Sequence, residues 1–214
     1  MVLHLYGSSK ATCTRRVATV LHEKGVPFVL HPIDIMKGEQ KSVEYLEKQP
    51  FGQVPYIDDD GFILYESRAI CQYIALKYAD RGIPLIPTDL KGQALFYQAA
   101  STETANFDPY AHAVVKEKVF KPMFGMEPDQ KVFDDALAVL TSKLDVYEKI
   151  LSKQKYLAGD EITLADLYHL PYASLLPLAG TDVIQARPNV ARWYNDISSR
   201  PSWQAVKETI ESTA

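Results

Sequence analysis

Two short segments carry polar and backbone groups whose spacing suits a bound ligand. The first is Phe51-Gly52-Gln53-Val54-Pro55, immediately before an apolar run that predicts a strand. A trans proline would simply open that strand. A cis bond would instead turn the backbone N–H and C=O of Val54 outward, where an extended ligand could pair with them.

The second segment is Glu66-Ser67, directly before a predicted helix over 68–78. Free N–H groups and the helix dipole attract a carboxylate at such a start, the Ser67 hydroxyl can add a hydrogen bond, and Glu66 can hold an ammonium. The alternative is that Ser67 only caps the helix. Taken together, the two segments predict a site for an extended, peptide-like molecule that has an amino acid at one end.

Other kinds of chemistry find little support in the sequence. The five histidines show no spacing with cysteines or carboxylates that is typical of a metal site, and no nucleotide-binding or serine-hydrolase motif occurs. With 23 Lys+Arg against 27 Asp+Glu, the net charge of −4 argues against a nucleic-acid surface. No apolar run approaches membrane-spanning length, and no secretory signal is visible. We therefore expect no metal, no nucleic acid, no membrane and a cytoplasmic location.

The elements that must position these segments change along the chain. The first 80 residues predict the order β-α-β-α-β-β-α, with strands at 2–6, 28–30, 56–57 and 62–65 and helices at 12–24, 37–48 and 68–78. Strands that flank the first helix should be parallel and the last two antiparallel, giving one mixed four-stranded sheet. Residues 81–90 read as a linker. Residues 91–214 predict an all-helical domain, with helices at 91–118, 129–153, 163–176, 188–199 and 201–212. Thr163 and Asp166 form a capping box there.

With these motifs in this order, the sequence resembles the cytosolic glutathione transferases over its whole length. Gln53-Val54-Pro55 and Glu66-Ser67-Arg68-Ala69-Ile70 carry the resemblance, and Thr14-Arg15-Arg16-Val17 and Lys37-Gly38-Glu39-Gln40-Lys41 make the phi class the best match. The resemblance implies an α/β plus all-α fold: a thioredoxin-like N-terminal domain over residues 1–80, with Pro55 cis, and an all-helical domain over 91–214.

The resemblance also implies roles for individual residues towards glutathione, the expected co-substrate. Val54 would pair its backbone with the cysteinyl unit, Glu66 and Ser67 would hold the γ-glutamyl end, and Gln53 would add a side-chain contact. Gln40 and Lys41 would lie near the glycine carboxylate, although many phi members carry histidine where Gln40 stands. From the residues alone, Lys41 could equally be a solvated helix lysine.

One departure concerns the activation of the glutathione thiol. Phi members use a serine at the start of the first helix, and counting back from Arg16-Val17 places that position at Ala11, which has no hydroxyl. Thr12 is the first replacement, and Ser9 or Ser8 could reach in from the preceding loop. Cys13 could act as a redox thiol, but two helical residues rotate it by about 200° from position 11. We expect Cys13 and Cys71 to be buried core residues.

The expected activity is conjugation of glutathione to hydrophobic electrophiles, or reduction of peroxides with it. Two alternatives stay open: a ligandin-like binding protein with weak turnover because Ala11 lacks the hydroxyl, and a thiol oxidoreductase that acts through Cys13. The family also implies a homodimer and a hydrophobic substrate site between the domains. Its expected lining is Ile35, Phe107, Tyr110, His112, Met123 and Phe124.

Overall fold

The computed structural model describes residues 2–214, which divide into two compact units. Unit 1 comprises the chain up to Ile86 together with Arg200–Ala214, and unit 2 is Pro87–Ser199. The division between Ile86 and Pro87 lies inside the expected linker at 81–90. However, the C-terminal segment that we expected in the helical domain belongs to unit 1.

Unit 1 contains the mixed four-stranded sheet that the sequence predicts. Its strands follow the order β2-β1-β3-β4; β1 pairs with β2 in parallel, and the β1–β3 and β3–β4 pairs are antiparallel. The bounds are β1 (Leu3–Gly7), β2 (Phe28–Pro32), β3 (Tyr56–Asp59) and β4 (Phe62–Tyr65). The thioredoxin-like architecture expected for the first half is therefore confirmed.

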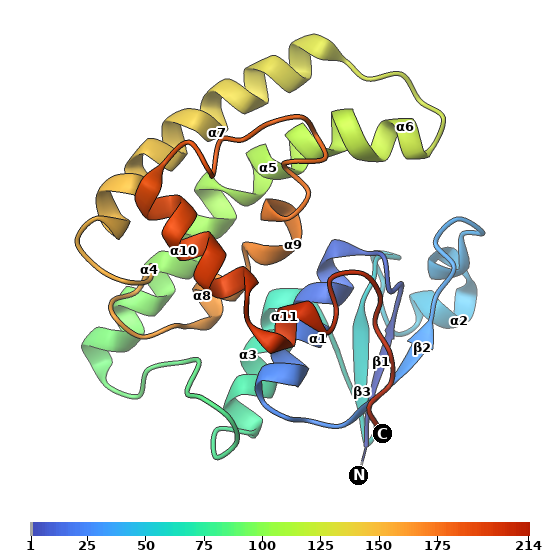
Figure 1. The fold of residues 1–214 in the computed structure, drawn as a ribbon. Helices are drawn as coiled ribbons and strands as arrows, with labels where there is room; N and C mark the ends of the chain where they lie inside the picture. The colour runs from blue at the N-terminus through green and yellow to red at the C-terminus, as the bar shows by residue number, and fades with distance from the viewer. Residues whose placement is uncertain (1) are drawn as a thin grey trace. The chain divides into compact units, whose positions relative to one another are not determined.

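Two amphipathic helices, α1 (Thr12–Glu23) and α3 (Ser67–Lys77), cover one face of this sheet (Figure 1). Leu3 and Leu5 alternate into the core below these helices, because successive strand residues point to opposite faces. The helix expected over 37–48 is much shorter. The segment forms one 3-10 turn, η1 (Glu39–Lys41), and a single turn of α-helix, α2 (Val43–Leu46).

The C-terminal segment closes unit 1. It begins with α11 (Pro201–Gln204), which packs against α1, and Figure 1 shows the red chain after α11 running back to the sheet. The helix expected over 201–212 is wrong beyond Gln204. The last residues instead bond to the open edge of β2: the Thr213 N–H donates to Phe28 O (2.9 Å), and the Leu30 N–H donates to Ser212 Oγ (2.9 Å). These bonds cover part of an otherwise unpaired strand edge.

Unit 2 is all-helical, as the sequence predicts, although two expected long helices are interrupted. The first breaks at Phe107, because Pro109 has no N–H for a continuing helical bond. The second breaks between Leu167 and Leu170. The helices are α4 (Leu90–Asn106), α5 (Asp108–Val115), the π-helix η2 (Lys116–Phe120), α6 (Lys121–Met123), α7 (Gln130–Leu151), α8 (Leu164–Leu167), α9 (Leu170–Ala173) and α10 (Pro188–Ser198). Among the described residues, no helix is long and apolar enough to cross a membrane.

Asp166 has the capping role that the sequence predicts. Its fully buried carboxylate accepts the Thr163 N–H at 2.9 Å, which completes the capping box. It also accepts the Leu157 N–H and the Trp193 indole N–H, each at 2.9 Å. Asp166 therefore joins α8, α10 and the preceding loop, and its carboxylate is fully used for structure.

Candidate functional site

The peptide bond between Val54 and Pro55 is cis, directly before β3. Pro55 is buried and Val54 is half-buried. Among residues 2–214, neither the N–H nor the C=O of Val54 has a backbone partner, because the β3 ladder begins at Tyr56. The bond thus has the cis form, which the residues left open and the resemblance implies, and Val54 beside it has the two free backbone groups that an extended peptide needs.

Three side-chain hydrogen bonds hold the turn before Val54, in addition to the backbone bond from the Gly52 N–H to Gln49 O at 2.9 Å. The Tyr45 hydroxyl donates to Gln53 O at 2.8 Å, and the Gln53 N–H donates to Gln49 Oε1 at 3.2 Å. The Lys41 ammonium donates to Phe51 O at 3.0 Å. The Gln53 side chain remains exposed above this fixed backbone, where a ligand can reach it.

Close packing brings the end of β1 against the cis proline and α1. A Cβ added at Gly7 would lie 2.6 Å from Thr14 Oγ1 and 3.1 Å from the Pro55 Cβ. No larger side chain fits between these groups without moving them. The sequence predicted that the first strand ends at residue 6, and this close approach explains why a glycine follows it.

The second segment lies at the start of α3, as expected. Glu66 has φ 68°, a left-handed conformation that is uncommon for residues other than glycine and that gathers at functional sites. Its side chain is exposed, whereas Ser67 is buried. Because the first N–H groups of a helix have no intrahelical acceptor, this end can receive a carboxylate.

Arg16 orients the Ser67 hydroxyl, a role that the sequence did not predict. Arg16 of α1 is only 1% exposed, and its Nη1 donates to Ser67 Oγ at 2.9 Å. Because the Ser67 oxygen accepts from Arg16, its own proton remains available to a ligand oxygen. The sequence does contain a signal for this bond. Arg16 is a charged residue next to the apolar Val17 in an amphipathic helix, and a charge that becomes buried there requires a partner.

No side chain caps the start of α1. Ala11 is the N-cap, with φ −78° and ψ 132°, and makes no side-chain bond. Thr12 is the first helical residue and is 8% exposed, while Ser8 and Ser9 are half-buried in the preceding loop. Thr12 therefore places both a hydroxyl and an N–H at the positive end of the dipole.

The two cysteines differ in environment. Cys71 is fully buried, as expected, and burial raises the pKa of its thiol to about 12. Cys13 is half-buried rather than buried, and its Sγ lies 3.4 Å from Arg16 Nη1. Burial of Cys13 was therefore a wrong expectation, because its position in the first turn of α1 leaves one side uncovered.

Gln40 and Lys41 lie on η1, beside the turn that leads to Val54. Lys41 is exposed and has two further N–H donors beyond its bond to Phe51. Gln40 Nε2 donates to Ile35 O at 3.4 Å, whereas its buried Oε1 has no partner among the described residues.

The described residues also contain no cluster of three or more His, Cys, Asp or Glu that could hold a metal ion.

The residues expected to line a hydrophobic substrate site have different surroundings. Ile35 lies in unit 1, half-buried before η1, and Tyr110 is half-buried on α5 of unit 2. His112 of the same helix is exposed and lies 5.5 Å from the Tyr172 ring, centroid to centroid. Phe107 is 1% exposed and packs against the His169 ring at 4.6 Å, which makes it a core residue of unit 2.

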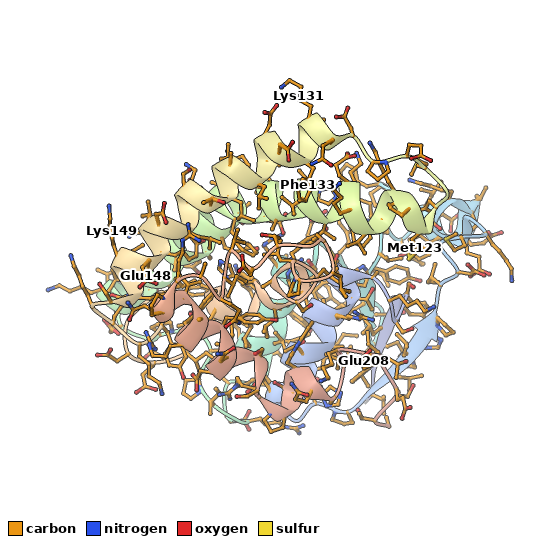
Figure 2. All side chains as sticks on the ribbon, turned by 45° about the horizontal axis from the view of Figure 1, so that its top comes forward. Met123, Lys131, Phe133, Glu148, Lys149 and Glu208 are labelled. Carbon is orange, nitrogen blue, oxygen red and sulfur yellow. The ribbon has the colours of Figure 1, made fainter. Side chains whose placement is uncertain are left out.

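Met123 and Phe124, by contrast, are 56% and 43% exposed. Figure 2 shows Met123 at the end of α6, and Phe133 of α7 on the neighbouring helix. The turn after α6 thus presents large apolar side chains to the surface of unit 2.

Unit 2 also has a cavity of about 280 Å³ between α4 and α7, which the sequence did not suggest. Leu95 and Ala99 of α4 face Val146 and Ile150 of α7 across it. Lys149 of α7, labelled in Figure 2, also lines it.

Comparison with known proteins agrees with this geometry. The glutathione S-transferase N-terminal domain matches residues 1–76, and the glutathione S-transferase C-terminal domain matches residues 107–201. Glutathione S-transferase PM239X14 of Arabidopsis thaliana is 43% identical over 198 residues, which cover 91% of this chain and 90% of that protein.

Solved structures extend the likeness to three dimensions. Glutathione transferase F7 from Populus trichocarpa superposes with a TM-score of 0.92 at 44% identity, covering 97% of this chain and 98% of that one. Glutathione S-transferase I from mais, in complex with an atrazine glutathione conjugate, superposes with a TM-score of 0.87 at 36% identity, covering 97% of each chain. A cis-proline turn, a serine at the start of α3 and these full-length matches lead to one conclusion: the chain belongs to the glutathione S-transferase family.

Proposed function

We propose that this protein is a phi-class transferase that binds glutathione in unit 1 and conjugates its sulfur to hydrophobic electrophiles, or uses it to reduce peroxides. The free backbone groups of Val54 beside the cis Pro55 carry this proposal. A strand-like peptide can pair with both groups, as the cysteinyl unit of glutathione would. The atrazine glutathione conjugate bound by glutathione S-transferase I from mais supports the same substrate class.

The other proposed contacts are to the two ends of glutathione, the γ-glutamyl group and the glycine carboxylate. The γ-glutamyl carboxylate would lie at the start of α3, with the Ser67 proton directed to it, and the exposed Glu66 would hold the ammonium. Gln53 would contribute its side chain. Lys41 has donors for the glycine carboxylate, and the unpartnered Gln40 Oε1 can accept an N–H nearby.

Activation of the thiol is the step on which the chemistry depends. A free thiol has a pKa of about 8.5, and donors at a helix start lower it. Thr12 would supply its hydroxyl and N–H, with Ser9 as the second candidate. The thiolate then attacks the electrophilic carbon, the leaving group takes the bonding electrons, and the thiol proton goes to solvent. Ile35, Tyr110, His112, Met123 and Phe124 would receive the electrophile.

Conjugation of a chlorodinitrobenzene-type substrate tests this assignment in wild type, Thr12→Ala, Ser9→Ala and Ala11→Ser. We expect Thr12→Ala to lower kcat/KM about tenfold, the loss of roughly one hydrogen bond to a charged sulfur. No change in Thr12→Ala would overturn the role of Thr12. A protein that does not bind immobilised glutathione would overturn the function as a whole.

The absence of a hydroxyl at Ala11 supports a second candidate, a ligandin-like protein that binds glutathione and hydrophobic compounds with little turnover. If Ala11→Ser raises turnover by an order of magnitude at unchanged glutathione affinity, the natural protein is primarily a binder. A third candidate, a thiol oxidoreductase, rests on the half-buried Cys13. Cys13→Ser would then abolish disulfide reduction.

We also propose a homodimer, because large apolar side chains are exposed on both units. Phe51 and Leu76 of unit 1 are 62% and 61% exposed, and Leu95 and Val146 beside the unit 2 cavity are 49% and 51% exposed. Val146→Lys should yield monomers in light scattering. The matched control is Val132→Lys at the other end of α7, where Val132 is 43% exposed. Equal masses for both variants would contradict this interface. The cytoplasmic location stays a prediction.

A further inference from the structure

Arg15 joins two segments of unit 1 that are far apart in the sequence. Its Nε donates to the Ser9 backbone oxygen at 3.0 Å, and its Nη2 donates to the Glu208 backbone oxygen at 3.1 Å. Ser9 lies in the loop before α1, and Glu208 lies in the chain after α11, where Figure 2 labels it. One half-buried guanidinium therefore connects this loop to the C-terminal tail, residues 205–214.

The geometry of an α-helix explains why position 15 can do this. Helical side chains lean toward the N-terminus, so a long side chain one turn into α1 reaches back over the loop that precedes it. The planar guanidinium then presents separate N–H groups to two acceptors at once. A lysine at this position would keep the charge but would not offer the fixed fork.

The loop from Ser8 to Ala11 needs such a support. Its internal tie is the bond from the Ala11 N–H to Ser8 O at 3.0 Å, which closes a single turn. The conformation of this turn sets where α1 begins, and with it the position of the Thr12 hydroxyl and N–H. Arg15 is the link that holds the Ser9 carbonyl from outside the turn.

The tail provides a firm anchor for the other end of the fork. Val206 is fully buried and Ile210 is 4% exposed, on either side of Glu208. Beyond them, the Thr213 N–H donates to Phe28 O at 2.9 Å. The Glu208 carbonyl is thus held between a buried core residue on one side and the edge of β2 on the other.

We propose that Arg15 is a positioning residue for thiol activation, and that the docked C-terminal tail, acting through Arg15, fixes the loop that presents Thr12 to the glutathione sulfur. This inference rests on the proposed function, since it concerns the same thiol. The tail would thus affect thiol activation although none of its side chains lies in the site. Arg15 and the tail would act on the pKa of the bound thiol more than on the affinity for glutathione.

The experiment measures the pKa of enzyme-bound glutathione from the ultraviolet absorbance of its thiolate, and in parallel the dissociation constant by calorimetry. We expect Arg15→Ala to raise the bound thiol pKa by about one unit, which is a tenfold smaller ratio of thiolate to thiol at a given pH. Glutathione affinity should change by less than about threefold. Arg15→Lys keeps the charge but loses the planar fork that bonds two carbonyls at once. It should therefore raise the bound thiol pKa as Arg15→Ala does.

Two controls separate the fork from the tail's other properties. Glu208→Gln removes the side-chain charge but keeps the carbonyl, so the thiol pKa should stay at the wild-type value. A chain that ends after residue 211 keeps Glu208 and the buried Ile210 but loses the bonds to β2, so its thiol pKa should stay closer to wild type than that of Arg15→Ala. A chain that ends after residue 207 should reproduce the shift of Arg15→Ala.

The outcomes distinguish this inference from the proposed function. If wild type binds glutathione with a depressed thiol pKa and Arg15→Lys leaves that pKa unchanged, Arg15 only stabilises the fold and the inference is overturned. If wild type shows no depressed thiol pKa at all, the proposed thiol activation itself fails. Should Arg15→Ala not fold, Arg15→Lys and the truncation pair decide the question.

Discussion

The buried Arg16 guanidinium donates to the hydroxyl of Ser67, with 2.9 Å between Nη1 and Oγ. This bond joins α1, just past its first turn, to the first residue of α3. Thiol activation is proposed at the start of α1 and binding of the γ-glutamyl end at the start of α3. It also sets the direction of the serine hydroxyl, because an oxygen that accepts from arginine has its own proton free for another partner.

Ser67→Ala should therefore weaken glutathione binding. Loss of a hydrogen bond to a carboxylate costs about 1.5 kcal/mol, which corresponds to roughly a tenfold higher Kd. Calorimetry measures it. Ser212→Ala is the matched control, since that hydroxyl accepts the Leu30 N–H at the edge of β2 instead. Equal affinities of the two variants would remove Ser67 from the binding site.

Ala11→Ser should stabilise the protein as well as change its turnover. Ala11 is the N-cap of α1 and has extended backbone angles, which are those that let a serine side chain accept an N–H of the first turn. The expected gain is about 1 kcal/mol in the free energy of unfolding, read from urea curves. Lys10→Ser, one residue outside the cap, should leave stability unchanged. A stability gain in both variants would show that capping is not its cause.

The pH dependence of the stability of unit 2 below neutral pH should depend on the ionisation of Glu117. This buried carboxylate pairs with Lys121 at 2.6 Å and accepts the Asp129 N–H at 2.7 Å, and the hydrogen bond from Lys121 is the main reason its pKa is lowered. A lowered folded-state pKa stabilises the fold above the unfolded value of 4.5, and the benefit is lost as pH falls through the folded value.

Glu117→Gln should therefore lower the melting temperature at pH 7 and flatten its decline between about pH 5 and 3. Lys131→Gln, which removes only an exposed pair with Asp135, should leave the pH profile as in wild type. A Glu117→Gln profile that remains as steep as wild type would assign the acid sensitivity to other carboxylates.

Thiol labelling should find one reactive cysteine in the native protein and two after unfolding. The Cys71 thiol is fully buried, and its pKa is raised to about 12, so almost no thiolate forms at neutral pH. Cys13 is half-buried and reachable. Cys13→Ser should abolish native labelling, and Cys71→Ser should leave it intact. Native labelling of two thiols would mean that α1 and α3 separate readily.

The sequence predicted well those features that depend on local pattern. Hydrophobic alternation and the turn residues predicted the sequence of strands and helices along unit 1 and its mixed sheet, and the capping box at Thr163 and Asp166 has the role assigned to it. The Val54–Pro55 turn could be located in the same way, although its isomer came from the resemblance and not from the residues.

Features that depend on distant contacts could not be predicted. Nothing local to Phe107 shows that His169, far along the chain, packs against its ring. The partner of Ser67 lies on another helix, and the exposure of Cys13 depends on what covers the first turn of α1. The helical pattern after Gln204 was real, but bonding of the last residues to β2 outweighed it, since propensity is a weak prior against tertiary contacts.

The return of residues 200–214 to unit 1 has a consequence for how the chain is made. Synthesis proceeds from the N-terminus, so the sheet and its helices are made before unit 2, yet the edge of β2 and the Arg15 fork wait for residues 200–214, which are made after it. The whole of unit 2 is made in the interval and can fold on its own local contacts. A chain that stops between residues 199 and 208 would thus have its helical unit complete, while unit 1 would lack the Arg15 fork and the bonds at the edge of β2.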